Sequence, residues 1–237
     1  MNAVIIYDNA TDNEEIRYGW GFSCLVDQRI LFDTGEQADS LFHNMKQLHV
    51  DIDQIEAVVI SHDHWDHTGG LWALLNKRNR LPIYACPGFS AEFKQKVRQC
   101  KGTLIEAETY KDIDEGVAIT GEIPGEYNGA FMPEQALMLK SGKGITVITG
   151  CSHPGIVTMI QTVKRFYSDT QIPLVFGGFH LMNTKPAAIR RIAASMREIG
   201  VEKVGPTHCS GHEAQMIFKE IYGDDFIAIK AGHALEI

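Results

Sequence analysis

The sequence predicts a single α/β domain over residues 1–237. Short runs of β-branched residues alternate with amphipathic stretches along the whole chain. No repeat, low-complexity stretch or linker interrupts this alternation. A layered α/β domain of this length can bury a substantial core without disulfides. Two sets of strands interleaved with helices suggest sheets covered by helices, as in a four-layer αββα sandwich, although the pattern alone supports only one α/β domain.

In the first half of the chain, apolar runs bounded by turn residues predict strands, and apolar residues at helical spacing predict helices. A hairpin is expected to turn at Asp27 and Gln28. Leu41, Met45 and Leu48 recur at the spacing of a helix. The expected strands are 4–7, 22–26, 29–32, 57–60 and 82–85, and the expected helices are 39–49, 70–75 and 90–100.

The second half of the chain continues the alternation of strands and helices. Its apolar runs are short, which is typical of strands buried in a sheet. The expected strands are 103–105, 117–120, 136–140, 144–149, 173–177, 203–205 and 226–229, and the expected helices are 155–167, 186–199 and 211–222.

Charge and composition exclude several classes of function. The net charge is -8, which argues against a general affinity for nucleic acid or anionic membranes, because phosphate binding needs a basic surface. No apolar run approaches the length of a bilayer span, and the N-terminus has no pattern of a signal peptide. The five cysteines include no CxxC pair, so reduced thiols in a cytoplasmic protein are expected.

A cluster of metal-binding side chains lies at residues 61–70, directly after the apolar run 57–60. It contains His62, His64 and His67, together with the carboxylates of Asp63 and Asp66. Imidazole and carboxylate suit zinc and similar divalent ions. In an extended segment His62 and His64 point to the same side and can hold one metal together. After a turn, Asp66 and His67 can reach a second metal position.

The pattern His62-x-His64-x-Asp66-His67 resembles the HxHxDH motif of the metallo-β-lactamase superfamily. The turn Phe32-Asp33-Thr34-Gly35 is similar to the one that precedes this motif in the superfamily, where the Asp supports the ligands from behind. The resemblance implies the αββα sandwich of that superfamily and two divalent ions, with zinc as the first expectation and manganese or iron as alternatives. It also implies that Asp66 orients or deprotonates the attacking water.

Three later histidines each follow an apolar run, where α/β folds place their functional crevice. The resemblance assigns His153 to the first metal and His208 to the second. His180 stands where most of the superfamily has a bridging Asp. It is expected as a ligand, with indirect support of the site and substrate contact as open alternatives. The carboxylates between His153 and His208 are not obvious replacements for that bridge, because none follows an apolar strand; they are Asp169, Glu198 and Glu202.

Cys151 and Cys209 each adjoin a proposed ligand. Alternation of side chains predicts that both point away from the metal, as buried inert thiols, with metal thiolates or nucleophiles as the alternatives. Histidine and Asp66 supply six or seven ligands in this prediction, so thiolate ligation is not required.

Ser210 and Glu213 match a capping box at the start of the last long helix. The amide groups at this helix start, with Ser210 and His212, could bind a substrate phosphate. Ordinary capping without a ligand is the alternative.

Several further patterns resemble one branch of the superfamily, the 7,8-dihydropterin-6-yl-methyl-4-(β-D-ribofuranosyl)aminobenzene 5′-phosphate synthases. The residues between Pro124 and Glu134 depart from that branch in being shorter and less acidic. The matching segments are 19–23, 120–124, 134–137, 150–156, 177–181 and 208–211.

Three functions follow as expectations. The first is hydrolysis of an anionic, phosphorylated or ester small molecule by a hydroxide held between two metals. The second is the transfer of a pterin, for which Trp20, Trp65 and Tyr127 are candidate contacts. The third is a non-enzymatic module that binds a metal or ligand. The sequence does not fix the oligomeric state.

Overall fold

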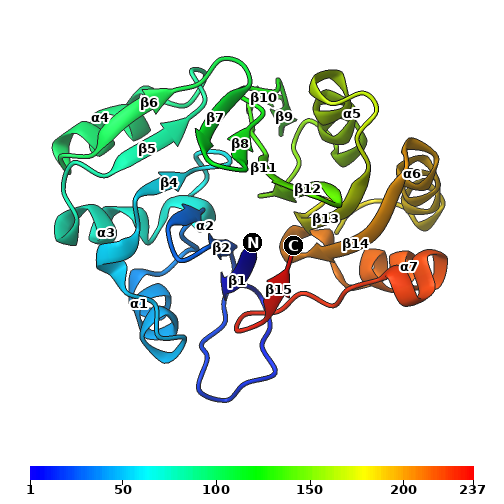
Figure 1. The fold of residues 1–237 in the computed structure, drawn as a ribbon, viewed down its shortest axis with the longest axis horizontal. Helices are drawn as coiled ribbons and strands as arrows, with labels where there is room; N and C mark the ends of the chain where they lie inside the picture. Colours follow the sequence, from blue (N-terminus) through cyan, green and yellow to red (C-terminus); the bar gives the residue numbers. More distant parts are fainter. The chain divides into compact units, whose positions relative to one another are not determined.

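The computed structural model describes all residues from 1 to 237, and its mixture of helices and several sheets confirms the predicted fold class (Figure 1). The chain divides into two compact units. Unit 1 comprises Met1–Glu108 and Lys230–Ile237, and unit 2 comprises Thr109–Ile229. A single domain over residues 1–237 stays a prediction. None of the helices is long and apolar enough to span a bilayer.

Unit 1 is built on a seven-stranded sheet in the order β15-β1-β2-β3-β4-β5-β6. The pairs from β3 to β6 are parallel, so those strands end at the same edge of the sheet. The strands are β1 (Asn2–Tyr7), β2 (Ser23–Val26), β3 (Ile30–Phe32), β4 (Ala57–Val59), β5 (Pro82–Ala85), β6 (Thr103–Glu106) and β15 (Ala234–Glu236). The helices are α1 (Ala38–Gln47), α2 (Trp65–Thr68), α3 (Leu71–Lys77) and α4 (Ala91–Gln99).

The core of unit 1 joins the apolar faces of three helices to the sheet. Leu41 of α1, Leu74 of α3 and Val97 of α4 pack in one cluster with strand residues such as Leu31 and Val58. The predicted hairpin between β2 and β3 is confirmed. Asp27 and Gln28 both have positive φ, as a type I′ turn requires.

Unit 2 is built on a six-stranded sheet in the order β14-β13-β12-β11-β8-β7. β12, β13 and β14 run parallel, and the other pairs are antiparallel. The strands are β7 (Lys111–Asp114), β8 (Val117–Ile119), β11 (Leu137–Ser141), β12 (Gly144–Thr149), β13 (Ile172–Gly178) and β14 (Val201–Thr207), with a separate hairpin of β9 (Glu126–Tyr127) and β10 (Ala130–Phe131). The helices are α5 (Ile156–Phe166), α6 (Pro186–Ile199) and α7 (His212–Tyr222).

The three helices of unit 2 bury one core with the sheet, and Figure 1 shows them beside β12, β13 and β14. Ile160 of α5, Ala193 of α6 and Phe218 of α7 belong to this core, together with Val147 and Val175 from the central strands. The three parallel strands end at one edge, and the three predicted later ligands follow at that edge.

One predicted strand is wrong. Residues 226–229 form no strand, because pairing stops after a single parallel bridge between Phe226 and Val204. The Ile229 side chain is buried and lies against Gly205, so its apolar character reflects packing and does not indicate a strand. The structure also contains α2, β7, β9, β10 and β15, which the sequence patterns did not predict.

Candidate metal centre

The HxHxDH motif of unit 1 lies directly after β4 and extends into the short helix α2. The ring centroids of His62 and His67 are 4.1 Å apart, and those of His62 and His64 are 4.8 Å apart. His62, Asp66 and His67 are buried and His64 is half-buried. An Asp66 carboxylate oxygen lies 3.7 Å from Nε2 of His67. The motif therefore gathers three imidazoles and one carboxylate.

Two histidines of the motif are held by hydrogen bonds at Nδ1. Oδ2 of Asp33 lies 2.7 Å from Nδ1 of His67, and Oγ of Ser61 lies 2.8 Å from Nδ1 of His62. Ser61 is itself fixed, because its amide and hydroxyl both donate to Asp33 at 2.7 Å. When Nδ1 donates to an acceptor, Nε2 presents its lone pair, which is the arrangement of a metal-ligating histidine.

Asp33 is fully buried and has positive φ. Burial raises the pKa of its carboxyl group, and hydrogen bonds from His67 and Ser61 oppose that rise. The following turn is tied to α2, since the Thr34 hydroxyl donates to the His67 carbonyl at 2.8 Å. Gly35 also has positive φ, and a Cβ there would lie 2.7 Å from the Tyr7 ring. The close packing of this turn explains why its residues are Asp-Thr-Gly.

The ligands predicted in unit 2 follow three neighbouring parallel strands: His153 after β12, His180 after β13 and His208 after β14. The rings of His153 and His180 are 4.6 Å apart. The donor atoms of Cys151, His153 and His180 all lie within 4.8 Å of one another. Those of Cys151, His208 and Cys209 form a second group with the same limit. Imidazole and thiol donors at this spacing fit a divalent metal.

Glu134 supports His153 and was missed as a site residue. Its Oε2 lies 3.1 Å from Nδ1 of His153 and accepts from the His153 amide at 2.9 Å. Its Oε1 accepts from the amides of Cys151 and Ser152, both at 2.8 Å. Burial alone would raise the pKa of Glu134, but the contacts with His153 and the backbone amides lower it to about 2. A buried carboxylate thus supports one histidine in each unit.

The two cysteines differ from the prediction. Both are buried, as expected, but their sulfur atoms lie among the histidine donors instead of pointing away. Simple alternation fails because Ser152 and His208 have positive φ, so the chain turns at both strand ends. Cys209 Sγ donates to the Cys151 carbonyl at 3.6 Å. Burial opposes ionisation of Cys209, but Cys151, His208 and His180 together hold its pKa well below the usual range.

The predicted capping box at α7 does not form. The N-cap of α7 is Gly211, and no side chain caps the helix. Ser210 is buried in a 3₁₀ turn, and its hydroxyl accepts from the Phe179 amide at 3.0 Å. This hydrogen bond ties the segment after β14 to the segment after β13. His212 is exposed at the first position of α7.

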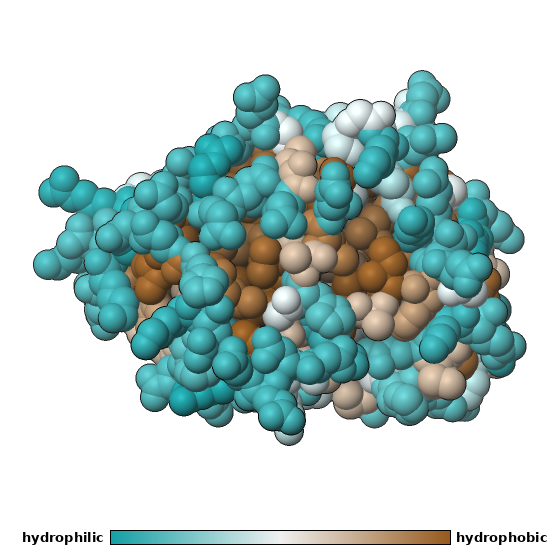
Figure 2. Space-filling model, turned by 60° about the horizontal axis from the view of Figure 1, so that its bottom comes forward, coloured by the Kyte–Doolittle hydropathy of each residue, from teal (hydrophilic) through white to brown (hydrophobic).

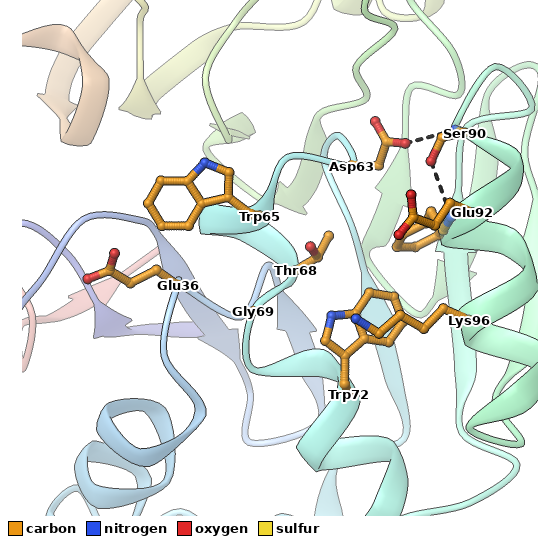
Figure 3. A pocket seen from close by; sticks show the side chains of 10 residues that line it. Glu36, Asp63, Trp65, Thr68, Gly69, Trp72, Ser90, Glu92 and Lys96 are labelled. Carbon is orange, nitrogen blue, oxygen red and sulfur yellow. Dashed lines mark hydrogen bonds between the residues drawn. The ribbon is translucent and has the colours of Figure 1, made fainter.

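A cavity of about 310 Å³ lies in unit 1 beside the motif (Figure 3). Trp65, which is 61% exposed, and Trp72 line it, and Lys96 extends over the Trp72 ring at 4.2 Å from its centroid. Asp63 accepts from the Ser90 amide at 2.7 Å, so the segments after β4 and β5 are joined across the cavity. The cavity combines aromatic faces with polar groups and adjoins His64 along the chain.

A second cavity, of about 220 Å³, lies in unit 2 beside His153 and His180. The Tyr127 ring lies 5.3 Å from the His153 ring and 5.6 Å from the His180 ring, edge to face in both cases. Tyr127 is 38% exposed and belongs to the β9–β10 hairpin.

Figure 2 shows one face of the molecule, on which hydrophilic side chains surround hydrophobic areas.

These donor groups could hold a metal ion, and comparison with known families is more specific. A family model described as the metallo-β-lactamase superfamily matches residues 23–158, which are 136 of the 237 residues. The chain belongs to the metallo-β-lactamase superfamily.

Two relatives from Methanocaldococcus jannaschii match most of the chain. The chain is 28% identical over 250 residues to a 7,8-dihydropterin-6-methyl-4-(β-D-ribofuranosyl)-aminobenzene-5′-phosphate synthase, and the match covers 89% of this chain and 85% of the relative. An uncharacterised protein of the same organism is 29% identical over 225 residues, with 82% and 85% covered. The branch resemblance expected from the sequence is therefore confirmed.

Solved structures confirm the fold. Tm1679, described as a metal-dependent hydrolase of the β-lactamase superfamily, has a TM-score of 0.84 and 29% identity, with 100% of this chain and 99% of that chain covered. Zn²⁺-bound PqqB from Methylobacterium extorquens has a TM-score of 0.67 with both chains fully covered, and its 15% identity supports similarity of fold alone.

Proposed function

We propose that this protein is a metal-dependent enzyme that acts on an anionic small molecule. The observation that carries the proposal is the support of the histidines at Nδ1. Asp33 holds His67, Ser61 holds His62 and Glu134 holds His153. Burying a carboxylate is costly unless its hydrogen bonds are satisfied, so two such pairs indicate a function beyond packing.

We propose that the chain binds two divalent ions, with zinc as the first candidate metal and manganese or iron as alternatives. The family motif supports this assignment, and so does the similar supporting carboxylate in each unit. A structural zinc is closed by four ligands, whereas this chain offers seven. The proposed ligands are His62, His64, Asp66, His67, His153, His180 and His208.

Hydrolysis is the first candidate reaction. The 29% identity to a structure described as a metal-dependent hydrolase favours it. When bound, two divalent ions supply Lewis acidity to a water molecule and to the scissile oxygen. Asp66, buried beside His67, is the residue proposed to orient that water and accept its proton. Ser210 and His212 stay proposed contacts for the anionic group of the substrate.

Transfer of a pterin is the second candidate. The cavity with Trp65 and Trp72 favours it, because indole rings stack on flat heteroaromatic groups. The relative named as a pterin-pathway synthase supports the same reading. In this reaction an aromatic amine would displace the diphosphate of a dihydropterin diphosphate, form the new C–N bond and lose a proton to solvent. Bound metal ions would supply positive charge for the leaving diphosphate, and no water would attack.

Metal analysis and an activity panel test the proposal together. The protein, purified without chelator, should contain about two divalent ions per chain. It is then incubated with bis(p-nitrophenyl) phosphate, with p-nitrophenyl acetate, and with a dihydropterin diphosphate plus an aromatic amine. Release of nitrophenol that is lost in Asp66→Asn supports hydrolysis, and a coupled pterin product supports transfer. Metal content well below one, not restored by Zn, Mn or Fe, would refute the proposal.

A further inference from the structure

The proposed histidine ligands of unit 2 supply no negative charge to the proposed binuclear centre. His180 stands where the superfamily usually has a bridging Asp, and a neutral imidazole brings no negative charge. The three carboxylates between His153 and His208 in sequence cannot replace it, because their side chains are exposed on the surface of unit 2. They are Asp169, Glu198 and Glu202.

Cys151 is the residue that the two donor groups of unit 2 share. Its sulfur lies within 4.8 Å of the donor atoms of His153 and His180, and also within 4.8 Å of those of His208 and Cys209. His153 and His208 are the proposed ligands of different metals. A single buried sulfur is thus in reach of both sets, whereas each histidine belongs to only one of them.

The position of Cys151 is fixed by its backbone. One residue separates Cys151 from the end of β12, and the Cys151 amide donates a hydrogen bond to Glu134 at 2.8 Å. The same carboxylate holds His153, so sulfur and imidazole are oriented by one group. Cys151 and His153 are two residues apart, and both direct their donor atoms to the same cluster.

We propose that Cys151, as a thiolate, is the anionic ligand shared by the two metal positions, in place of the absent carboxylate. This inference rests on the proposed function. Binding replaces the S–H bond with bonds from sulfur to metal and releases the proton to solvent. With Zn–S near 2.3 Å and Zn–N near 2.0 Å, a sulfur and a nitrogen on one tetrahedral ion are about 3.5 Å apart. Because the donor atoms lie within 4.8 Å of one another, the sulfur and a nitrogen would have to approach by at most about 1 Å to bind the same ion.

Cys209 provides the matched control. It is also a buried thiol, but it belongs only to the group with His208. Its Sγ donates to the Cys151 carbonyl, a bond that a serine hydroxyl can also make. Replacing either cysteine by serine removes one sulfur and keeps a similar volume, so the two variants separate the two thiols.

Cobalt substitution tests the assignment without an activity assay. Wild type, Cys151→Ser and Cys209→Ser are reconstituted with Co²⁺, and thiolate-to-cobalt charge transfer is read in the near ultraviolet while cobalt content is measured. Wild type and Cys209→Ser should show the band with about two ions bound, and Cys151→Ser should lose the band and bind the second ion at least about tenfold more weakly. A band of wild-type intensity in Cys151→Ser, or its absence from wild type with two ions bound, would overturn the inference.

A second measurement needs no variant. Wild-type protein is alkylated with iodoacetamide in the zinc-loaded and chelated states, and each cysteine is quantified by mass spectrometry. Zinc should slow modification of Cys151 about tenfold or more, while the half-buried Cys100 serves as the reference. Equal rates in both states would contradict the inference. If two ions bind without any effect on Cys151, only this inference fails; if no metal binds, the proposed function fails as well.

Discussion

Substitution of Glu134 tests whether a buried, hydrogen-bonded carboxylate stabilises the candidate site. Its carboxylate is fully buried in unit 2 and accepts four hydrogen bonds, three from backbone amides and one from the His153 ring. Glu134→Gln keeps the shape but replaces one oxygen with an NH₂ group. That group must face two donors, because each oxygen of the native carboxylate accepts two bonds.

The expected loss of stability follows from the pKa of Glu134. Glu134 has a pKa of about 2 in the folded protein, compared with 4.5 ordinarily. That difference corresponds to about 3 kcal/mol of stability at neutral pH. Because the folded pKa is lowered, this contribution is complete above pH 4.5 and is lost as the pH falls through about 2. Near pH 3 roughly half of it should remain.

Urea unfolding of the metal-free protein measures the effect at pH 7 and at pH 3. Glu134→Gln should lower the free energy of unfolding by about 3 kcal/mol at pH 7, and the difference from wild type should shrink at pH 3. The exposed Glu198→Gln on α6 serves as the control and should change little. If Glu134→Gln stays within about 0.5 kcal/mol of wild type at pH 7, the account of the buried carboxylate is wrong.

Three further substitutions test other parts of the site. Asp33→Asn should weaken zinc binding about 10- to 100-fold in a chelator competition, because Nδ1 of His67 loses a charged acceptor; unchanged affinity would contradict this role. Tyr127→Ala should raise KM about 3- to 10-fold, because the ring contact with His180 is lost, while Tyr127→Phe should keep a KM near that of wild type. Equal KM values in the two variants would exclude a role of the Tyr127 ring in substrate binding. Asp66→Asn should lower kcat about 10²- to 10⁴-fold with the fold retained, and a loss of only a few-fold would remove Asp66 from the mechanism.

Most elements could be predicted because their patterns are local. The hairpin at Asp27 and the helix with Leu41 and Met45 show the spacing that burial requires. The β9–β10 hairpin was missed although Asn128-Gly129 is a strong signal for a two-residue turn, and both residues have positive φ. Its strands are two residues long and exposed, so no apolar alternation marks them.

The candidate ligand histidines could be selected from the sequence because each follows a strand, which is a property of sequence order. The supporting groups could not be predicted in the same way. Ser61 has no pattern beyond its place beside His62, and Glu134 precedes β11, 19 residues before His153. Only the antiparallel pairing of β11 with β12 brings that carboxylate to the histidine. The positions of the cysteine sulfurs depend on positive φ at single residues, which alternation does not show.

Each unit orients its candidate ligands through pairing of its own strands. In unit 1, Asp33 follows β3 and acts on His67 beyond the neighbouring strand β4. In unit 2, Glu134 precedes β11 and acts on His153 after the neighbouring strand β12. Both arrangements are fixed by strand pairing and by hydrogen bonds that need no metal. The imidazoles of His67 and His153 are therefore oriented without an ion, with Nε2 directed outward from the supporting carboxylate. If they bind a metal as proposed, this orientation would lower the entropy lost on binding.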